Sequence, residues 1–317
     1  MTGTIFVTGS GGMVGRNLLE HAHAAGYRIL APRRAELDLR DAEAVSRYVA
    51  AHRPDLIIQI AGKVGGIEAN RREPSAFLVE NIQIGLNVVL AAREQGVPQL
   101  LNLASSCMYP RDHLDPLQED MVLTGMLEPT NEGYALAKIA TARLCRYIRT
   151  EEPALRYKTI IPCNIYGRHD SFDPIRSHLV PATLRKVWEA QQAGSPAVSI
   201  WGDGTARREF MYAEDLADFV WEAVERFDDL PDEINAGLGD DYSVNDYYHV
   251  AAQIVGWDGR FVHELDRPAG MARKLVDVGR QRAFGWQPRF TLEEGMRRTY
   301  EYFLGKQARS AAGAVAA

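Results

Sequence analysis

Residues 5–15 read IFVTGSGGMVG, and this segment carries the strongest indication of the architecture. An apolar run leads directly into a TGxxGxxG array, Gly9, Gly12 and Gly15, at which a helical pattern begins. Glycines permit a tight turn and a close approach of the backbone, and a helix start offers free N–H groups to a diphosphate. Glycine also collects in ordinary turns, but between a strand and a helix the array predicts a dinucleotide-binding site.

Apolar, β-branched segments alternate with amphipathic segments of helical length through the first half of the chain. We predict strands over residues 4–8, 28–31, 56–61, 99–105 and 157–166, and helices over residues 13–25, 42–52, 74–95 and 132–150. Strands that are apolar throughout and joined by helices form parallel sheets covered on both faces. The expected fold class is α/β, a Rossmann-type doubly wound parallel sheet.

Beyond residue 166 the pattern becomes irregular, with a helix expected near 179–193 and a strand near 197–202. We expect a smaller C-terminal lobe that binds the substrate and is interleaved with the last strands of the sheet. The predicted dinucleotide-binding domain comprises residues 1–166 plus roughly 206–236, the substrate-binding lobe comprises roughly 167–205 and 237–306, and residues 307–317 are expected to form a flexible tail.

Composition narrows the class of protein. The chain has 317 residues, of which 46% are hydrophobic and 25% charged, as is typical of a soluble globular protein. A net charge of −6 disfavours a nucleic-acid or anionic-membrane surface, and no uncharged apolar run approaches the length of a membrane span. Three widely spaced cysteines do not make a disulfide framework. We therefore expect a cytoplasmic protein without nucleic-acid or membrane partners, and we predict no metal site.

The end of the second predicted strand distinguishes between the two nicotinamide cofactors. An acidic residue there is typical of NAD sites, whereas arginine suits the 2′-phosphate of NADP. The sequence APRRAELDL places Arg33 and Arg34 at this point, with no carboxylate before Glu36. Two arginines in a loop are often only a solvated surface, but at this location they favour NADP(H). Asp38 and Leu39 follow, and we expect them to hold the adenine.

A second motif, YxxxK, is formed by Tyr134 and Lys138. Residues at i and i+4 share one face of a helix, so the ammonium can approach the phenol. Such pairs also occur by chance, but Ser105 ends the fourth predicted strand, at the edge of a parallel sheet where ligands bind. We expect the lysine and a bound cofactor to lower the tyrosine pKa from about 10.

The TGxxGxxG turn, the SSCMYP segment (residues 105–110) and the YxxxK pair resemble, in this order, the extended short-chain dehydrogenase/reductases, the family of nucleotide-sugar epimerases and dehydratases. The resemblance implies that Ser105 polarises a substrate carbonyl, that Tyr134 transfers a proton and that Lys138 also holds the nicotinamide ribose. It also implies cofactor contacts from His178 and from the residues around the turn, namely Gly9, Gly12, Met13, Val14, Gly15 and Ala61.

Within this family several segments resemble the GDP-L-fucose synthases, NADPH-dependent GDP-4-keto-6-deoxymannose 3,5-epimerase/4-reductases. They are residues 61–70, 105–110, 127–140, 164–174, 177–186, 201–217 and 273–278. In those enzymes a cysteine and a histidine handle the epimerisation protons, and Cys107 and His178 match them. A free cysteine is often only a small buried hydrophobe, which is how we interpret Cys145 and Cys163.

The chemistry of a 4-keto sugar explains the need for such a pair. The ketone acidifies the C–H bonds at C3 and C5, and inversion requires a base on one face and an acid on the other. Ser105 and Tyr134 would stabilise the enolate oxygen during this step. Tyr134 would then protonate O4 when the ketone is reduced.

The same resemblance implies a GDP-sugar substrate, with Lys186, Trp201, Arg208 and Lys274 as substrate-binding residues. A solvated surface remains an alternative for each of them except Arg208. The main alternative function is a 4-keto reductase or an epimerase that acts on another GDP-keto sugar, of the colitose or heptose type. A non-catalytic NADP sensor is disfavoured because Ser105, Tyr134 and Lys138 are all present. The family also implies a homodimer, formed through the helices near 75–95 and 132–150.

Overall fold

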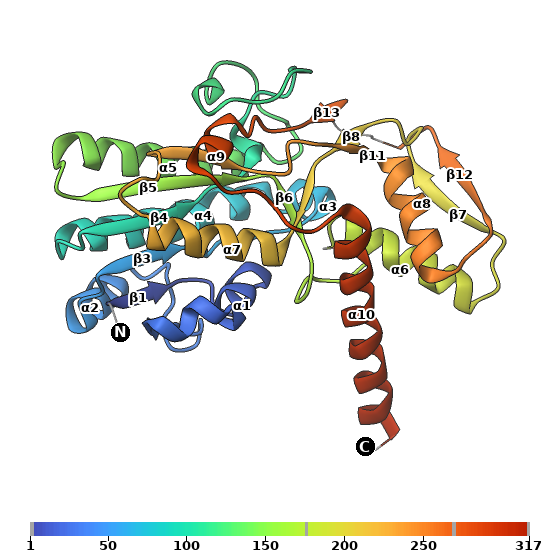
Figure 1. The fold of residues 1–317 in the computed structure, drawn as a ribbon, viewed down its shortest axis with the longest axis horizontal. Helices are drawn as coiled ribbons and strands as arrows, with labels where there is room; N and C mark the ends of the chain where they lie inside the picture. Colours follow the sequence, from blue (N-terminus) through green and yellow to red (C-terminus); the bar gives the residue numbers. More distant parts are fainter. Residues whose placement is uncertain (1–2, 175–176, 268–270, 316–317) are drawn as a thin grey trace.

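The computed structural model describes residues 3–174, 177–267 and 271–315. Its centre is a six-stranded parallel sheet in the order β10-β5-β4-β3-β1-β2 (Figure 1). The strands are β1 (Thr4–Val7), β2 (Arg28–Leu30), β3 (Leu56–Gln59), β4 (Gln99–Leu103), β5 (Arg156–Pro162) and β10 (Glu233–Ala236). The predicted α/β fold is therefore confirmed. Because all six strands run in one direction, their carboxyl ends share one edge of the sheet.

Helices cover both faces of this sheet. One layer contains α2 (Ala42–His52), α4 (Pro74–Glu94) and α5 (Glu132–Glu151), and the other contains α1 (Met13–Glu20), α7 (Ala213–Glu225) and α9 (Gly279–Phe284). Local sequence sets several of these ends. The Asp41 carboxylate accepts a hydrogen bond from the N–H of Ala44 at the start of α2, and Pro74 occupies the first position of α4.

Two predicted elements differ from the structure by more than two residues. The helix predicted over residues 13–25 ends at Glu20, and a short 3₁₀ segment, η1 (Ala22–Gly26), follows it. The strand predicted over residues 157–166 divides after Pro162, which has no N–H to donate to a ladder. Its remainder, β6 (Asn164–Tyr166), leaves the large sheet and pairs with β9 (Phe210–Tyr212). This division starts the passage of the chain into a second lobe.

The small lobe, at the right of Figure 1, has its own apolar core. It contains α6 (Leu179–Gln192), α8 (Val244–Val255), α10 (Leu292–Val315), and the pair β7 (Ala197–Trp201) and β12 (Arg260–Glu264). A separate three-stranded sheet consists of β11 (Tyr242–Ser243), β8 (Arg207–Arg208) and β13 (Arg273–Lys274). Short segments between the large elements are α3 (Ile67–Arg72), η2 (Ser106–Met108) and η3 (Glu119–Met121).

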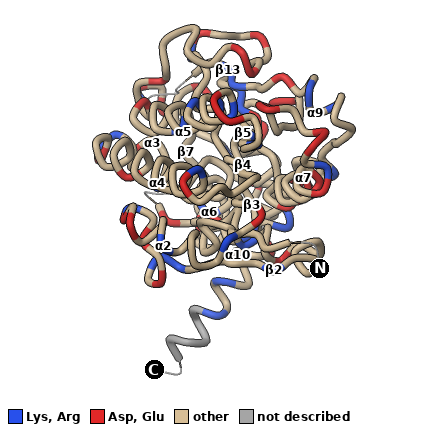
Figure 2. The backbone as a smooth tube through the Cα atoms, turned by 90° about the vertical axis from the view of Figure 1, so that its left-hand side faces the viewer, with Lys and Arg blue, Asp and Glu red and all other residues tan. Residues whose placement is uncertain are grey.

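The lobes are not continuous in sequence. Phe284 and Trp286, late in the chain, pack in the core against the large sheet. A few residues later, Leu292 belongs to the core of the small lobe, and Phe303 on α10 is also buried. Helix α10 then projects from the body of the molecule (Figures 1 and 2). It continues to Val315, so most of the predicted tail is helical in this structure.

Within the described residues, one helix, α4, has the length and apolar composition that a membrane span requires. A core helix of a soluble protein meets the same criterion. Helix α4 packs between α2 and α5 against the sheet, which accounts for its apolar composition.

Candidate active site

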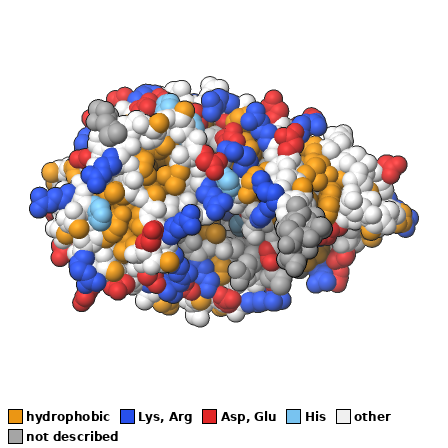
Figure 3. Space-filling model, turned by 90° about the horizontal axis from the view of Figure 1, so that it is seen from below, with side chains coloured by type: hydrophobic (Ala, Val, Ile, Leu, Met, Phe, Trp, Pro, Cys, Tyr) orange, Lys and Arg blue, Asp and Glu red, His pale blue; other side chains and the backbone are white. Residues whose placement is uncertain are grey.

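A cavity of about 1310 Å³ lies at the carboxyl edge of the large sheet, where the small lobe meets it. All of the residues predicted for the site line this cavity: Gly9, Gly12, Met13, Val14, Gly15, Arg33, Arg34, Asp38, Leu39, Ala61, Ser105, Cys107, Tyr134, Lys138, His178, Lys186, Trp201, Arg208 and Lys274. Figure 3 shows Lys and Arg side chains gathered in the middle of the face seen from below. The fold thus brings the sequence-predicted residues together.

The glycine turn leaves space where side chains would otherwise stand. Gly9 has a φ of +67°, in the left-handed region, and a Cβ there would lie 2.9 Å from the Cα of Ala61. A Cβ on Gly15 would lie 2.3 Å from the carbonyl oxygen of Gly9. Among the described residues, no atom lies within 4 Å of a Cβ built on Gly11, and no side chain caps α1 at Gly12. The helix N–H groups are therefore open to the cavity, which fits a dinucleotide diphosphate.

At the end of β2, Arg33 and Arg34 are exposed at the rim of the cavity. The neighbouring carboxylates are engaged with other groups. Glu36 accepts a hydrogen bond from the backbone N–H of Arg33 at 2.6 Å, and Asp38 accepts one from Arg40 at 2.6 Å. The hydrogen bonds from Arg40 lower the pKa of Asp38 to about 2. This rim is cationic and fits an added phosphate group.

Ser105, Tyr134 and Lys138 come together where β4 ends against α5. The Ser105 side chain accepts a hydrogen bond from the N–H of Cys107 at 3.3 Å and so starts η2. The Lys138 ammonium donates to the carbonyl oxygen of Leu103 at 2.8 Å and lies 5.8 Å from the centre of the Tyr134 ring. The YxxxK face of α5 is thereby held against the carboxyl edge of the sheet.

The lowered tyrosine pKa was expected from the lysine and a bound cofactor together, and in the protein alone the opposite shift prevails. Burial raises the pKa of Tyr134 well above its ordinary value, the nearby Cys107 raises it further, and the hydrogen bond with Ser105 acts in the opposite direction. Burial also lowers the pKa of Lys138 to about 8. The phenol is therefore protonated at neutral pH, which suits a group that donates a proton to a ketone oxygen.

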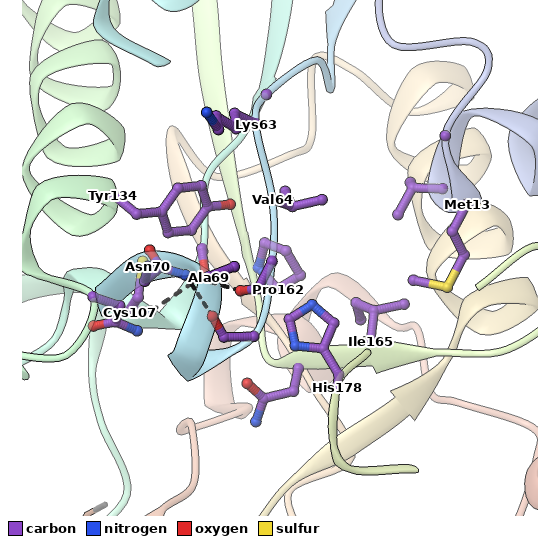
Figure 4. A pocket seen from close by; sticks show the side chains of 18 of the residues that line it. Met13, Lys63, Val64, Ala69, Asn70, Cys107, Tyr134, Pro162, Ile165 and His178 are labelled. Atoms are coloured by element: carbon purple, nitrogen blue, oxygen red, sulfur yellow. Dashed lines mark hydrogen bonds between the residues drawn. The ribbon is translucent and has the colours of Figure 1, made fainter. Parts of the chain in front are cut away.

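Cys107 and His178 approach the cavity from different elements, η2 and the N-terminus of α6. Figure 4 shows Cys107 and Tyr134 on one side of the pocket and His178 on the other. Burial raises the pKa of Cys107, with Lys274 opposing, and burial lowers the pKa of His178, with Lys274 adding to the effect. Both shifts favour the uncharged thiol and imidazole, so the pair offers one proton donor and one acceptor.

Cations line the part of the cavity that the small lobe covers. Arg208 and Lys274 are register partners on the parallel strands β8 and β13. The Lys186 ammonium lies 5.7 Å from the centre of the Trp201 ring, which is 44% exposed. Within the described residues, Arg273 lies outside the lining, so of the two neighbouring basic residues only Lys274 faces this space. Burial lowers the pKa of Lys186, Arg208 and Lys274.

Sequence reasoning overlooked Lys63, which also lines the cavity. Its ammonium donates to the Glu73 carboxylate at 2.7 Å and to the Glu80 carboxylate at 3.0 Å. Lys63 follows β3 at the carboxyl edge, as Ser105 follows β4. The positional signal that identified Ser105 would therefore have identified Lys63.

Comparison with known proteins places this geometry in a family. A family model described as "NAD dependent epimerase/dehydratase family" matches residues 5–237. The chain is 50% identical over 303 residues to a GDP-L-colitose synthase from Yersinia pseudotuberculosis, covering 96% of this chain and 98% of that protein. It is 49% identical over 300 residues to a GDP-L-fucose synthase from Azorhizobium caulinodans, covering 95% and 96%.

A similar solved structure is that of a GDP-mannoheptose C4 reductase from Campylobacter jejuni with NADP bound. It has 28% sequence identity and a TM-score of 0.85, and the match covers 95% of this chain and 98% of that one. The predicted membership of the nucleotide-sugar epimerases and dehydratases agrees with these matches, because a family model and two near full-length relatives point to the same group. The chain belongs to the NAD-dependent epimerase/dehydratase family.

Proposed function

We propose that the protein catalyses the NADPH-dependent 3,5-epimerisation and 4-keto reduction of a GDP-4-keto-6-deoxy sugar, with GDP-4-keto-6-deoxy-D-mannose as substrate and GDP-L-fucose as product. The observation that carries this proposal is the placement of Cys107 and His178 on different sides of the cavity that also contains Tyr134. A simple reductase needs no such second proton-transfer pair. The relatives of this chain include a GDP-L-fucose synthase, which supports the same reaction class.

The described residues fit NADP(H). The open glycine turn would hold the diphosphate, Arg33 and Arg34 the 2′-phosphate, and Lys138 the nicotinamide ribose. The NADP-bound Campylobacter relative supports this assignment. When bound, NADPH supplies the hydride that reduces the C4 ketone.

For epimerisation, one member of the Cys107/His178 pair removes the proton from the carbon next to the ketone. The electron pair of that C–H bond moves into an enolate whose oxygen accepts hydrogen bonds from Ser105 and Tyr134. The other member returns a proton to the opposite face, and the carbon is inverted. Each inversion exchanges one proton with solvent and consumes no reductant.

For reduction, Tyr134 supplies the proton that O4 needs as the carbonyl becomes an alcohol. Burial keeps this phenol protonated until then. Lys138 stays close to the ring, with its ammonium fixed on the Leu103 carbonyl oxygen, and would favour the tyrosinate that forms.

The GDP portion would occupy the small-lobe side. Arg208, Lys274 and Lys186 supply positive charge to the diphosphate, and the half-exposed Trp201 offers a face for the base or ribose. Arg208 and Lys274 are register partners on β8 and β13, and two neighbouring cations suit a diphosphate, which supports this assignment.

The reaction can be tested by incubating the protein with GDP-4-keto-6-deoxymannose and NADPH in D₂O and following the sugar by NMR. We expect deuterium at C3 and C5 of GDP-fucose, and loss of that exchange in Cys107→Ser. Cys163→Ser is the matched control, because Cys163 is also a buried thiol on the cavity wall. Reduction at C4 without deuterium would identify a simple 4-keto reductase and return Cys107 to a packing role.

A second candidate substrate is a GDP-4-keto-3,6-dideoxy sugar, as in colitose formation. The GDP-L-colitose synthase is as similar to this chain as the GDP-L-fucose synthase is. A sugar without a hydroxyl at C3 has no stereocentre there, so only C5 would be inverted. These substrates are distinguished by kcat/KM for the 3-hydroxy keto sugar divided by kcat/KM for the 3-deoxy keto sugar. A ratio above one supports our first choice.

We also propose that two copies associate through α4 and α5. Each helix carries a stripe of apolar side chains at helical spacing that is exposed in the single chain: Val79 and Leu90 are 50% and 46% exposed, and Leu136 and Tyr147 are 41% and 58% exposed. Sedimentation analysis should show a dimer that Leu90→Arg converts to monomer. Leu265→Arg, at a position 73% exposed in the small lobe, should leave the dimer intact. A monomeric wild-type protein would contradict the proposal.

A further inference from the structure

Four basic residues stand opposite one another on two very short strands. Strands β8 and β13 pair in parallel, with Arg207 opposite Arg273 and Arg208 opposite Lys274. Like charges placed directly opposite on a sheet repel each other. This pair of basic strands therefore needs negatively charged groups nearby. The position of those groups determines which side of the strands keeps its positive charge.

The counter-charge on one face is Asp241. Its carboxylate binds the Nε of Arg207 at 2.5 Å with one oxygen and the Nε of Arg273 at 2.5 Å with the other. Asp241 is 2% exposed, and its carbonyl oxygen also accepts a hydrogen bond from Arg207. Arg273 donates further to the Leu114 carbonyl oxygen at 2.9 Å. One buried carboxylate thus joins both strands through their first residues.

Because side chains alternate along a strand, this arrangement sends Arg208 and Lys274 to the other face. Both of these side chains line the cavity, whereas, within the described residues, Arg207 and Arg273 lie outside its lining. Asp241 therefore holds the outer pair and offsets part of its charge, while the inner pair is directed at the cavity.

A second buried carboxylate secures the segment that carries Asp241. Glu209, next to Arg208 on the chain, accepts hydrogen bonds from the N–H groups of Leu238 and Gly239 at 2.7 and 2.9 Å and of Val276 at 2.9 Å. The chain before Asp241 is tied to the end of β8, while Asp241 ties back to the start of β8 and β13. We call Asp241, Glu209, Arg207 and Arg273 the carboxylate lock.

We propose that Asp241 is a positioning residue for the substrate diphosphate, which through Arg207 and Arg273 holds Arg208 and Lys274 side by side in the cavity. The inference rests on the proposed function, because it takes the diphosphate of a sugar nucleotide as the ligand of those two cations. It adds that a carboxylate that does not itself face the ligand fixes the positions of the two cations that do.

The sign of one measurement separates positioning from simple electrostatics. Asp241→Asn removes a negative charge near an anion site, so Coulomb attraction alone would tighten the binding of GDP. Loss of the lock instead lets the two inner cations separate, and we expect the Kd for GDP to rise at least tenfold. The Kd for NADPH should stay within twofold, since that cofactor would bind at the other end of the cavity.

The matched control is Asp240→Asn, which removes the same charge one residue away. Asp240 is exposed and accepts a hydrogen bond from the N–H of Asp241. We expect it to change neither dissociation constant by more than twofold. Calorimetric titration of the full chain with GDP, and separately with NADPH, measures both values.

Arg207→Lys tests the same idea if Asp241→Asn does not fold. Its side chain is 46% exposed, and the substitution keeps the positive charge but loses the two-pronged contact. We expect about threefold weaker GDP binding with unchanged NADPH binding. The proposal is overturned if GDP binding is unchanged or tighter in Asp241→Asn. When Arg207→Lys must be used instead, unchanged GDP binding in that variant overturns it.

A wrong assignment of the GDP-sugar substrate gives a different result from a failure of the carboxylate lock. If the wild-type protein does not bind GDP, the same variants are titrated with inorganic pyrophosphate, which probes the cation pair without the base. A tenfold loss in Asp241→Asn would then uphold the lock while refuting the GDP-sugar assignment. If the wild-type protein binds neither ligand, the inner cations do not form a diphosphate site and the lock has no such role.

Discussion

The two ends of the cavity present positive charge in different ways. At the end assigned to the cofactor, the turn from Gly9 to Gly15 offers backbone N–H groups, and its shape depends on absent Cβ atoms. At the end assigned to the substrate, Arg208 and Lys274 offer side-chain charges from strands of two residues each. Backbone dipoles are fixed by the fold and do not titrate. The first end is therefore sensitive to added volume and the second to altered charge.

The largest effect that sharpens this contrast is expected from Gly15→Ala. The new methyl group would stand 2.3 Å from the Gly9 carbonyl oxygen, and the turn would have to open. Overpacking of about 1–3 kcal/mol predicts a loss of NADPH affinity of roughly five- to 150-fold. Gly26→Ala, outside the cavity lining and with open space for the added methyl group, is the control and should bind normally. Fluorescence titration with NADPH measures both, and equal affinities would contradict the role of the missing Cβ.

Removal of charge at the other end should act on the substrate alone. Arg208→Met is expected to raise KM for the keto sugar about tenfold or more, since a charged hydrogen bond contributes roughly 1.5–3 kcal/mol. NADPH affinity should not change. The matched control is Arg260→Met, an exposed arginine on β12 of the same lobe that lies outside the cavity lining. Steady-state kinetics with the keto sugar and NADPH varied in turn measure these effects. Equal KM values for the keto sugar in the two variants would contradict the role of Arg208.

Arg33 and Arg34 are the exception at the cofactor end, because they are side chains that supplement the backbone. The double variant Arg33→Ala/Arg34→Ala should weaken NADPH binding roughly tenfold, since exposed charges contribute about 1 kcal/mol or less each. NADH lacks the 2′-phosphate, so its affinity serves as the internal control and should stay the same. Parallel loss for both cofactors would mean that these residues hold something other than that phosphate.

The smallest expected effect is a change with pH. Burial lowers the pKa of Lys138 to about 8, so its ammonium form is lost as the pH rises through that value. A reaction that needs the cation should lose roughly threefold in kcat/KM between pH 7.5 and 8.5. Lys138→Arg keeps its charge at these pH values and should flatten the profile, even at a lower overall rate. If kcat/KM of this variant still falls near pH 8, the titrating group is not Lys138.

The sequence indicated the cofactor end more directly than the substrate end. Gly9, Gly12 and Gly15 act within one short segment, so their spacing alone predicts the turn between β1 and α1. The α/β fold followed from the alternation of strands and helices, and it is confirmed. Cys107 and His178 required the family resemblance, because nothing local to either residue indicates that they face one cavity. Their catalytic roles remain predictions.

Other features were beyond sequence reasoning for physical reasons. Asp241 binds residues more than thirty positions away on either side, and strands as short as β8 and β13 have no detectable periodicity. The raised pKa of Tyr134 was missed because burial depends on packing of the whole site, whereas only the neighbouring lysine is visible in the sequence. The end of α1 at Glu20 was missed because the following alanine-rich segment also favours a helix.

The pairing of β6 with β9 has a consequence for how such enzymes can be recombined. Asn164 lies opposite Phe210 and Tyr166 opposite Tyr212, so the ladder joins the segment that leaves the large sheet to the segment that returns. The small lobe is therefore made of separate inserts rather than one module. A chimaera that transplants substrate preference must graft both inserts and this ladder together. A single continuous exchange would leave half of the small-lobe core without its partner.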